Sequence, residues 1–172
     1  MLTRKDILGL FKMLDRELGK AGSNGEIGLC GGAVMCVVFK ARESTKDVDA
    51  VFEPTRVIRD AAACVAEMQD IPRDWLNDAA KGFFISDPPR ESVWEGKHLK
   101  VWAPSARYML AMKCVAARFD THDRSDVAFL IGHLGFKKVD EVFRVIEEFY
   151  PRKLIPAKTR FLVEELMDPH TG

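Results

Sequence analysis

Two carboxylates separated by a single residue are the feature of this sequence best suited to chemistry. Asp47-Val48-Asp49 opens a stretch, residues 47–53, whose alternation and β-branched residues predict a strand. Side chains at i and i+2 of a strand point to one face, so the two carboxylates would lie side by side. Two negative charges so near to each other favour a bound cation between them. Oxygen ligands suit Mg²⁺, which also binds substrate phosphates. The pair therefore indicates metal-dependent phosphoryl or nucleotidyl transfer, and the plain alternative is two solvated charges.

A pair of glycines, Gly31-Gly32, lies between a predicted strand at 27–30 and a predicted helix at 33–40. Glycine lets the backbone approach a phosphate closely, and a helix N-terminus presents N–H groups without partners inside the helix. For a lone Gly-Gly, an ordinary tight turn is the simpler interpretation. The third glycine of a dinucleotide fingerprint and the Lys-Ser/Thr of a P-loop are both missing, which excludes these two nucleotide-binding motifs.

The order strand, Gly-Gly, helix and then a strand with D-x-D resembles the nucleotidyltransferase superfamily of polymerase-β-like fold. In that family the glycine turn holds the triphosphate and the two acidic residues hold metal ions. The resemblance implies that Gly31 and Gly32 contact phosphates and that Asp47 and Asp49 bind metal and are catalytic.

Further segments place the resemblance in one branch of that superfamily. Arg42 and Thr45 fit an R-x-x-T-x-D-x-D variant, which implies that both belong to the nucleotide-binding residues. Residues 108–126 are similar to a helix and loop of the abortive-infection, type IV toxin nucleotidyltransferases and their uncharacterised relatives. Residues 75–82 are also similar to a stretch in those relatives. The resemblance spans about residues 27–134.

In that branch the pattern L-x-A-M-K-x-x-A-x-R is followed by D-x-x-D. It implies that Lys113 touches the nucleotide phosphates and that Asp126 is the distal acidic residue of the active site. Judged without the family, the stem of Lys113 would lie along the core with its ammonium in water, or paired with Asp123 or Asp126. The sequence departs from the superfamily in one respect, because the predicted strand at 99–102 holds no third carboxylate.

The elements expected around these residues make an α/β (α+β) fold, in which a nucleotidyltransferase core with a small mixed sheet precedes a helical C-terminal bundle. Residues 1–103 would form the core and 104–172 the helical part, packed together as one compact unit. The expected elements are a helix capped by Thr3 and ending near 19–22, strands at 27–30 and 47–53, helices at 33–40 and 54–69, a short helix from 72, a hairpin over 92–103, and helices starting at 104 and at 125–134, 139–149 and 156–167.

Composition sets outer limits on the function. The 172 residues contain 26 Lys and Arg against 26 Asp and Glu, so net charge points to no nucleic-acid or membrane partner. No apolar run reaches the roughly 18 residues of a membrane span, and the N-terminus does not read as a signal peptide, so a cytoplasmic protein is expected. The four cysteines form no zinc or disulfide pattern and are expected to be reduced thiols.

These features together predict a Mg²⁺- or Mn²⁺-dependent enzyme that moves a nucleoside monophosphate from an NTP to an acceptor. By resemblance the acceptor is a tRNA-like RNA or a protein hydroxyl, and an antitoxin protein is a further expected partner. Two alternatives stay open. The first is a catalytically silent nucleotide- or partner-binding module on the same fold, and the second is a purely structural α/β protein.

Overall fold

The chain is described here from a computed structural model, which covers residues 1–117 and 121–168. It divides into two compact units. Unit 1 consists of Met1–Gly82 and Arg90–Pro104, and unit 2 consists of Phe83–Pro89 and Ser105–Gly172. Strands gather in the first unit and most helices in the second, so the expected mixed α/β class is confirmed.

Unit 1 is built on a five-stranded mixed sheet of order β5-β4-β2-β7-β6. Its strands are β2 (Gly25–Leu29), β4 (Val48–Glu53), β5 (Leu76–Asn77), β6 (Arg90–Glu95) and β7 (Leu99–Pro104). Central β2 runs antiparallel to β4 and parallel to β7, and β6 and β7 form the expected hairpin. A separate two-stranded ladder joins β1 (Leu2–Thr3) to β3 (Ser44–Thr45).

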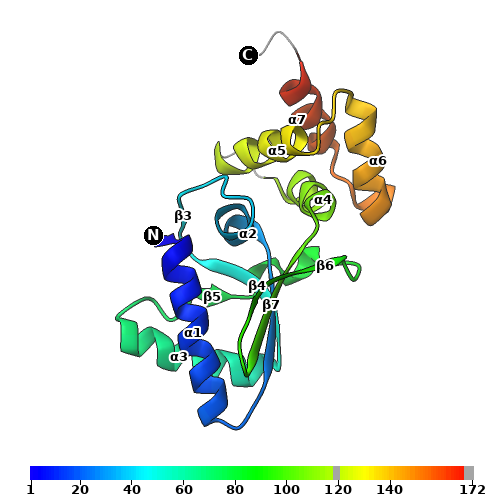
Figure 1. Cartoon of the computed structure of the whole chain (residues 1–172). Helices are drawn as coiled ribbons and strands as arrows, with labels where there is room; N and C mark the ends of the chain where they lie inside the picture. The colour runs from blue at the N-terminus through cyan, green and yellow to red at the C-terminus, as the bar shows by residue number, and fades with distance from the viewer. Residues whose placement is uncertain (118–120, 169–172) are drawn as a thin grey trace. The chain divides into compact units, whose positions relative to one another are not determined.

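Two long helices, α1 (Arg4–Lys20) and α3 (Thr55–Gln69), pack against each other and against the sheet, α1 on β7 and α3 on β4 (Figure 1). Thr3 caps α1 as its sequence predicts, because its hydroxyl accepts from the Asp6 N–H while the Asp6 carboxylate accepts from Thr3. The helices bury their apolar stripes, led in α1 by Phe11 and Leu14. One face of the sheet is thereby committed to the core.

The opposite face of β4 carries two acidic residues. Along this strand Val48, Ala50 and Phe52 are buried, whereas Asp49 is only half-buried and Glu53 is exposed. Strand residues alternate between faces, so the second set shares the face turned away from the core. The register extends this face into β2, where Glu26 pairs with Glu53 and Gly28 with Val51.

Two local expectations are wrong. The short helix expected from residue 72 is absent from the described chain there; Leu76–Asn77 instead form β5, parallel to β4, and Ala79–Phe83 form a 3₁₀ turn. The glycine pair does not precede its helix but begins it, because α2 runs Gly31–Val37. Both differences matter for the site described below, since β5 and the start of α2 flank the two carboxylates.

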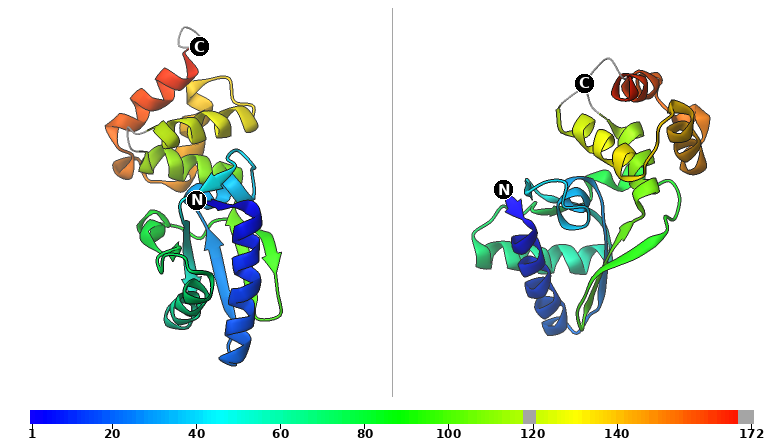
Figure 2. Two further views of the ribbon diagram at one scale, coloured as in Figure 1. Left: turned by 90° about the vertical axis from the view of Figure 1, so that its left-hand side faces the viewer. Right: turned by 45° about the horizontal axis from the view of Figure 1, so that its top comes forward.

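Unit 2 is a bundle of four α-helices within the part of the chain that the structure describes: α4 (Ala106–Ala116), α5 (Thr121–His133), α6 (Val139–Phe149) and α7 (Ala157–Met167). The other three all pack on α4 (Figure 2). A short 3₁₀ turn, Arg152–Leu154, joins α6 to α7. Ser105 caps α4 through its hydroxyl, and the connector expected up to residue 124 is shortened because α5 already begins at Thr121.

Two further expectations are limited by what the structure describes. Arg118 and Asp120, which belong to the segment similar to the toxin branch, lie outside the described residues. Over the ranges 1–117 and 121–168, no helix is long and apolar enough to cross a membrane.

The thiols give a first prediction. Cys64 is exposed, whereas Cys30, Cys36 and Cys114 are buried, and burial raises the pKa of Cys114 to about 12. Since the thiolate is the reactive species, a raised pKa keeps a thiol protonated and inert until the pH rises towards it. Iodoacetamide at pH 8 should therefore label the folded protein once, at Cys64, and the guanidinium-unfolded protein four times. Intact-mass and peptide mass spectrometry would read this out, and fast labelling of Cys114 in the folded chain would contradict it.

Candidate functional site

The start of α2 and the first half of β4 form the core of the site. The N–H of Cys30 donates to the Asp49 carbonyl at 2.9 Å, which holds the end of β2 against β4. Gly31 has a φ of +58°, and a Cβ added to it would lie 2.6 Å from Oδ2 of Asp49. Glycine is thus required twice over at position 31, by its left-handed backbone and by the carboxylate that lies against it.

The second glycine faces a hydroxyl and a guanidinium. A Cβ at Gly32 would lie 2.6 Å from Oγ1 of Thr45 and 3.2 Å from Nη1 of Arg42. Thr45 is buried at the end of β3, and Arg42 is half-buried in the loop before it. The Gly-Gly pair is therefore not only a tight turn; its missing side chains make room for an acid, a hydroxyl and a cation.

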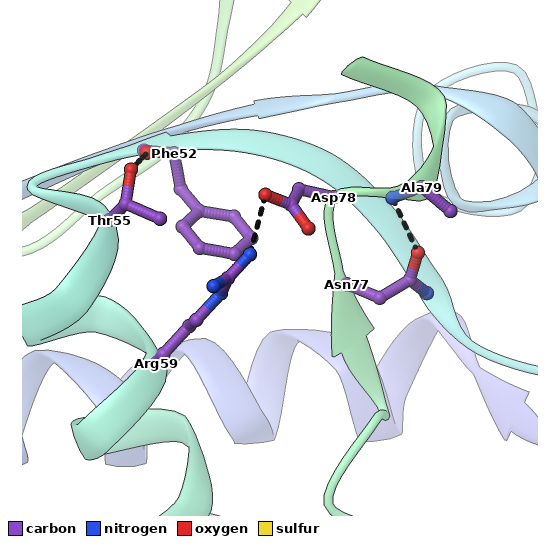
Figure 3. A network of polar contacts seen from close by, with 6 residues as sticks. All are labelled: Phe52, Thr55, Arg59, Asn77, Asp78 and Ala79. Carbon is purple, nitrogen blue, oxygen red and sulfur yellow. Dashed lines mark hydrogen bonds and ion pairs between the residues drawn. The ribbon is translucent and has the colours of Figure 1, made fainter. Parts of the chain in front are cut away.

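Asp47 is held from the neighbouring strand. Asn77 of β5 lies in register with Asp49, and its Nδ2 donates to Oδ2 of Asp47 at 3.3 Å. The other end of the same amide accepts from the Ala79 N–H at 3.0 Å, which fixes its orientation (Figure 3). No pattern in the sequence predicts this role of Asn77, since a two-residue strand shows no periodicity.

The loop that follows Asn77 is tied to α3. Arg59 of α3 donates to Oδ2 of Asp78 at 2.7 Å, and its guanidinium lies 6.0 Å from the centre of the Phe52 ring (Figure 3). Thr55 at the start of α3 donates to the Phe52 carbonyl at 3.2 Å. This network holds β5 beside β4, and so it holds the Asn77 amide against Asp47.

The donor set around Asp47 and Asp49 fits a hard divalent cation. Both side chains are only partly buried, and carboxylate oxygens are the ligands that Mg²⁺ prefers. Mg²⁺ is commonly held by one or two carboxylates, with water and substrate phosphates completing its shell. Within the described residues there is no cluster of three or more His, Cys, Asp or Glu side chains arranged for a metal. A cation here would thus need ligands from solvent or substrate.

The strand on which the resemblance expects a third acid carries an aromatic residue instead. Strand β7, Leu99–Pro104, contains no acidic residue. Trp102 pairs with Gly28 of β2, and its indole ring lies directly over that glycine, where any Cβ would collide with it. Arg90 stacks on the ring at 4.5 Å and forms an ion pair with Glu26. This end of the face is filled by a stacked and charge-paired cluster.

The two remaining predicted site residues lie in unit 2 and contact each other. Nζ of Lys113, in α4, is 2.8 Å from Oδ2 of Asp126 and 2.9 Å from Oδ1 of Asp123, both in α5. The side chains of Lys113 and Asp126 are only 10% and 3% exposed. One cation therefore bridges two carboxylates between α4 and α5, which realises the ion-pair alternative left open by the sequence. A role of Lys113 and Asp126 at a nucleotide stays a prediction.

Gly31→Ala gives a second prediction, which separates backbone strain from the approach of Asp49. The substitution should lower the free energy of unfolding by about 1–2 kcal/mol from the positive φ alone, and further because the Cβ displaces the Asp49 carboxylate. Gly22→Ala is the matched control, since Gly22 also has a positive φ (+62°) but no atom within 4 Å of an added Cβ. Chemical denaturation of both variants measures the difference. Equal losses would mean that the contact with Asp49 has no energetic weight.

Comparisons with known proteins add no assignment to this geometry. The chain matches no protein-family model, no curated protein and no solved structure at a significant level.

Proposed function

We propose that this chain is a metal-dependent nucleotidyltransferase, which moves a nucleoside monophosphate from an NTP to an acceptor hydroxyl. The observation that supports the proposal most directly is how closely the Asp49 carboxylate approaches Gly31. A Cβ added to Gly31 would lie only 2.6 Å from Oδ2 of Asp49. It brings the D-x-D strand and the Gly-Gly helix start into one cluster, together with Thr45 and Arg42. The resemblance to the nucleotidyltransferase superfamily implies that these same residues act together.

In the proposed reaction the acceptor oxygen attacks the α-phosphorus, and a new P–O bond forms. The bond from the α-phosphorus to the bridging oxygen of the β-phosphate breaks, pyrophosphate leaves, and the acceptor proton passes to solvent. A divalent cation, Mg²⁺ or Mn²⁺, would neutralise charge on the triphosphate when bound. Asp47 and Asp49 would hold it, and the Asn77 amide would orient Asp47. Arg42 and the Thr45 hydroxyl would hold phosphate oxygens beside the Gly31-Gly32 backbone.

Transfer of label tests this proposal directly. Each α-³²P-labelled NTP would be incubated in turn with the protein, with or without total tRNA, in Mg²⁺ and in EDTA. Labelled tRNA or labelled protein that requires both Mg²⁺ and Asp49 would support the transferase and would identify the acceptor. If tRNA is the acceptor, expression of the wild-type chain, but not of Asp49→Asn, should slow bacterial growth, and a partner that restores growth would be the antitoxin.

A catalytically silent module is the second candidate, and the occupation of the β7 face by Trp102 favours it, because no third acid is presented there. That module would bind NTP with Mg²⁺ and release it unchanged. Equilibrium binding of a labelled NTP without product formation over hours would select this candidate. An absence of both binding and transfer would contradict the two nucleotide-based functions together.

A further inference from the structure

A basic pocket adjoins the proposed site in unit 1. It has a volume of about 340 Å³ and is lined by Arg4, Cys36, Lys40, Ala41, Arg42 and Glu43. Three of these side chains are cations and one is an acid. We name these six residues the basic pocket. An excess of positive charge over a hollow of this size suits an anion with more than one charge.

The topology brings the pocket together from distant parts of the chain. Leu2 pairs with Thr45 and Thr3 with Ser44, so the start of α1 lies beside the strand that ends in Thr45. Arg4 is the first residue of α1, and its Nε donates to the carbonyl of Val37, the last residue of α2, at 3.1 Å. Arg4 is thereby fixed at the far end of the helix that begins with Gly31.

Two cations of the basic pocket, Arg4 and Lys40, lie at positions that are unfavourable for them. Arg4 and Lys5 open α1, where the positive end of the helix dipole repels cations. Lys40 has a φ of +55°, a left-handed conformation that costs a residue with a side chain about 1–2 kcal/mol. Local rules are broken most often at functional sites, where the strain serves a purpose. Both Arg4 and Lys40 line the same pocket.

Arg42 connects the basic pocket to the glycine pair. Its Nη1 lies 3.2 Å from the Cβ position of Gly32, and the same side chain lines the pocket. Burial raises the pKa of the Cys36 thiol in this pocket, and the nearby charges of Arg42 and Arg4 act in the opposite direction. Arg42 is therefore shared between the glycine pair and the basic pocket.

We infer that the basic pocket binds a pyrophosphate group, as the β- and γ-phosphates of the NTP before transfer and as the product afterwards. The role of this pocket in catalysis rests on the proposed function, whereas the binding of pyrophosphate to its cations does not. Guanidinium groups bind phosphate oxygens in bidentate pairs, and the Lys40 ammonium adds a point charge. The pocket would thus select triphosphates over monophosphates.

Binding of inorganic pyrophosphate in EDTA tests the inference without metal or turnover. Isothermal titration would compare the wild-type chain with Arg4→Gln/Lys40→Asn, in which asparagine tolerates the positive φ. We expect affinity to fall at least about tenfold, because two charge-assisted contacts are removed. Lys5→Gln is the matched control, since it removes a neighbouring charge from the same helix start outside the pocket. The affinity of the Lys5→Gln variant for pyrophosphate should stay within about twofold of wild type.

Arg4→Lys separates charge from packing. This variant keeps the cation, so pyrophosphate binding should recover most of its strength even if the contact with Val37 is weakened. A thermal melt would show whether Arg4→Gln/Lys40→Asn is folded; if it is not, Lys40→Asn alone serves, with an expected loss of at least about threefold. An unstructured RNA oligonucleotide with a 5′-hydroxyl provides a second probe, and its binding should not respond to these substitutions.

The outcomes separate this inference from the proposed function. If pyrophosphate binding depends on Arg4 and Lys40 but the protein transfers no label, the inference about the basic pocket is supported and the proposed transferase activity is contradicted. Label transfer with pyrophosphate binding that is absent, or indifferent to both substitutions, would uphold the transferase and overturn the pocket. If the substitutions weaken binding of the RNA oligonucleotide but not of pyrophosphate, the inference is also overturned, because the pocket would then bind a nucleic-acid backbone.

Discussion

The Asp49→Asn variant is expected to lose nucleotidyl transfer by a factor on the order of 10²–10³ or more, while it folds as well as the wild-type chain. Asparagine has nearly the same shape, so the space over Gly31 stays filled and the backbone bond from Cys30 to the Asp49 carbonyl is kept. In the proposed reaction, the substitution removes the negative charge that would hold the cation on the triphosphate. Transfer of α-labelled NTP, measured with Mg²⁺ in excess, gives the rate of each form.

The matched control lies on the same face of the same strand. Glu53→Gln also removes one negative charge, and Glu53 is exposed at the end of β4. Its transfer rate should stay within about threefold of wild type if the acids act through position and not through overall charge. A melt that moves by less than about 3 °C for both variants would show that each keeps its fold. Retention of more than a tenth of the activity by Asp49→Asn would exclude a catalytic Asp49.

The parts of the site that the sequence predicted are those with local patterns. Alternation over residues 47–53 predicted β4, because a half-buried strand must alternate, although the strand begins only at Val48 and leaves Asp47 in the bend before it. The Thr3 cap, the hairpin turn near Gly96 and the helices of the last third likewise follow from spacing within a few residues. Such signals depend only on neighbours along the chain.

The rest depends on contacts between distant segments, for which the sequence has no local mark. The spacing of Trp75, Leu76, Ala79 and Ala80 fits a helix, yet pairing with Val48 and Asp49 turns Leu76–Asn77 into a strand. Tertiary pairing overrode the local propensity, and the contact of Asn77 with Asp47 was missed for that reason.

The basic pocket was missed for the same physical reason. Its first cation, Arg4, lies 36 residues before Lys40, and the pairing of β1 with β3 and the bond from Arg4 to the Val37 carbonyl bring the two segments together. In the sequence Arg4 reads as an ordinary charge beside a helix cap. The surrounding cations become meaningful only when the ladder between β1 and β3 is known, since each alone is consistent with a solvated surface.

The Lys113→Met variant is expected to lose about 3–5 kcal/mol of unfolding free energy, because it leaves the carboxylate of Asp126, only 3% exposed, without its cation. For a chain of this size that loss corresponds to a melting temperature lower by roughly 6–20 °C. Arg107→Met on the same helix is the control. It breaks the exposed ion pair with Glu148 and should cost no more than about 1 kcal/mol. Urea denaturation of both variants measures the two losses.

A compensating substitution then separates the two interpretations of Lys113. In Lys113→Met/Asp126→Leu the buried charge is removed together with its partner, and apolar contacts between α4 and α5 should restore most of the stability. Asp123 is 23% exposed and can be solvated without the ammonium. A stable double variant that still transfers label, or still binds NTP, would make the Lys113 cluster a purely structural link. A stable double variant that has lost both would place Lys113 or Asp126 in the nucleotide chemistry, as the sequence resemblance implies.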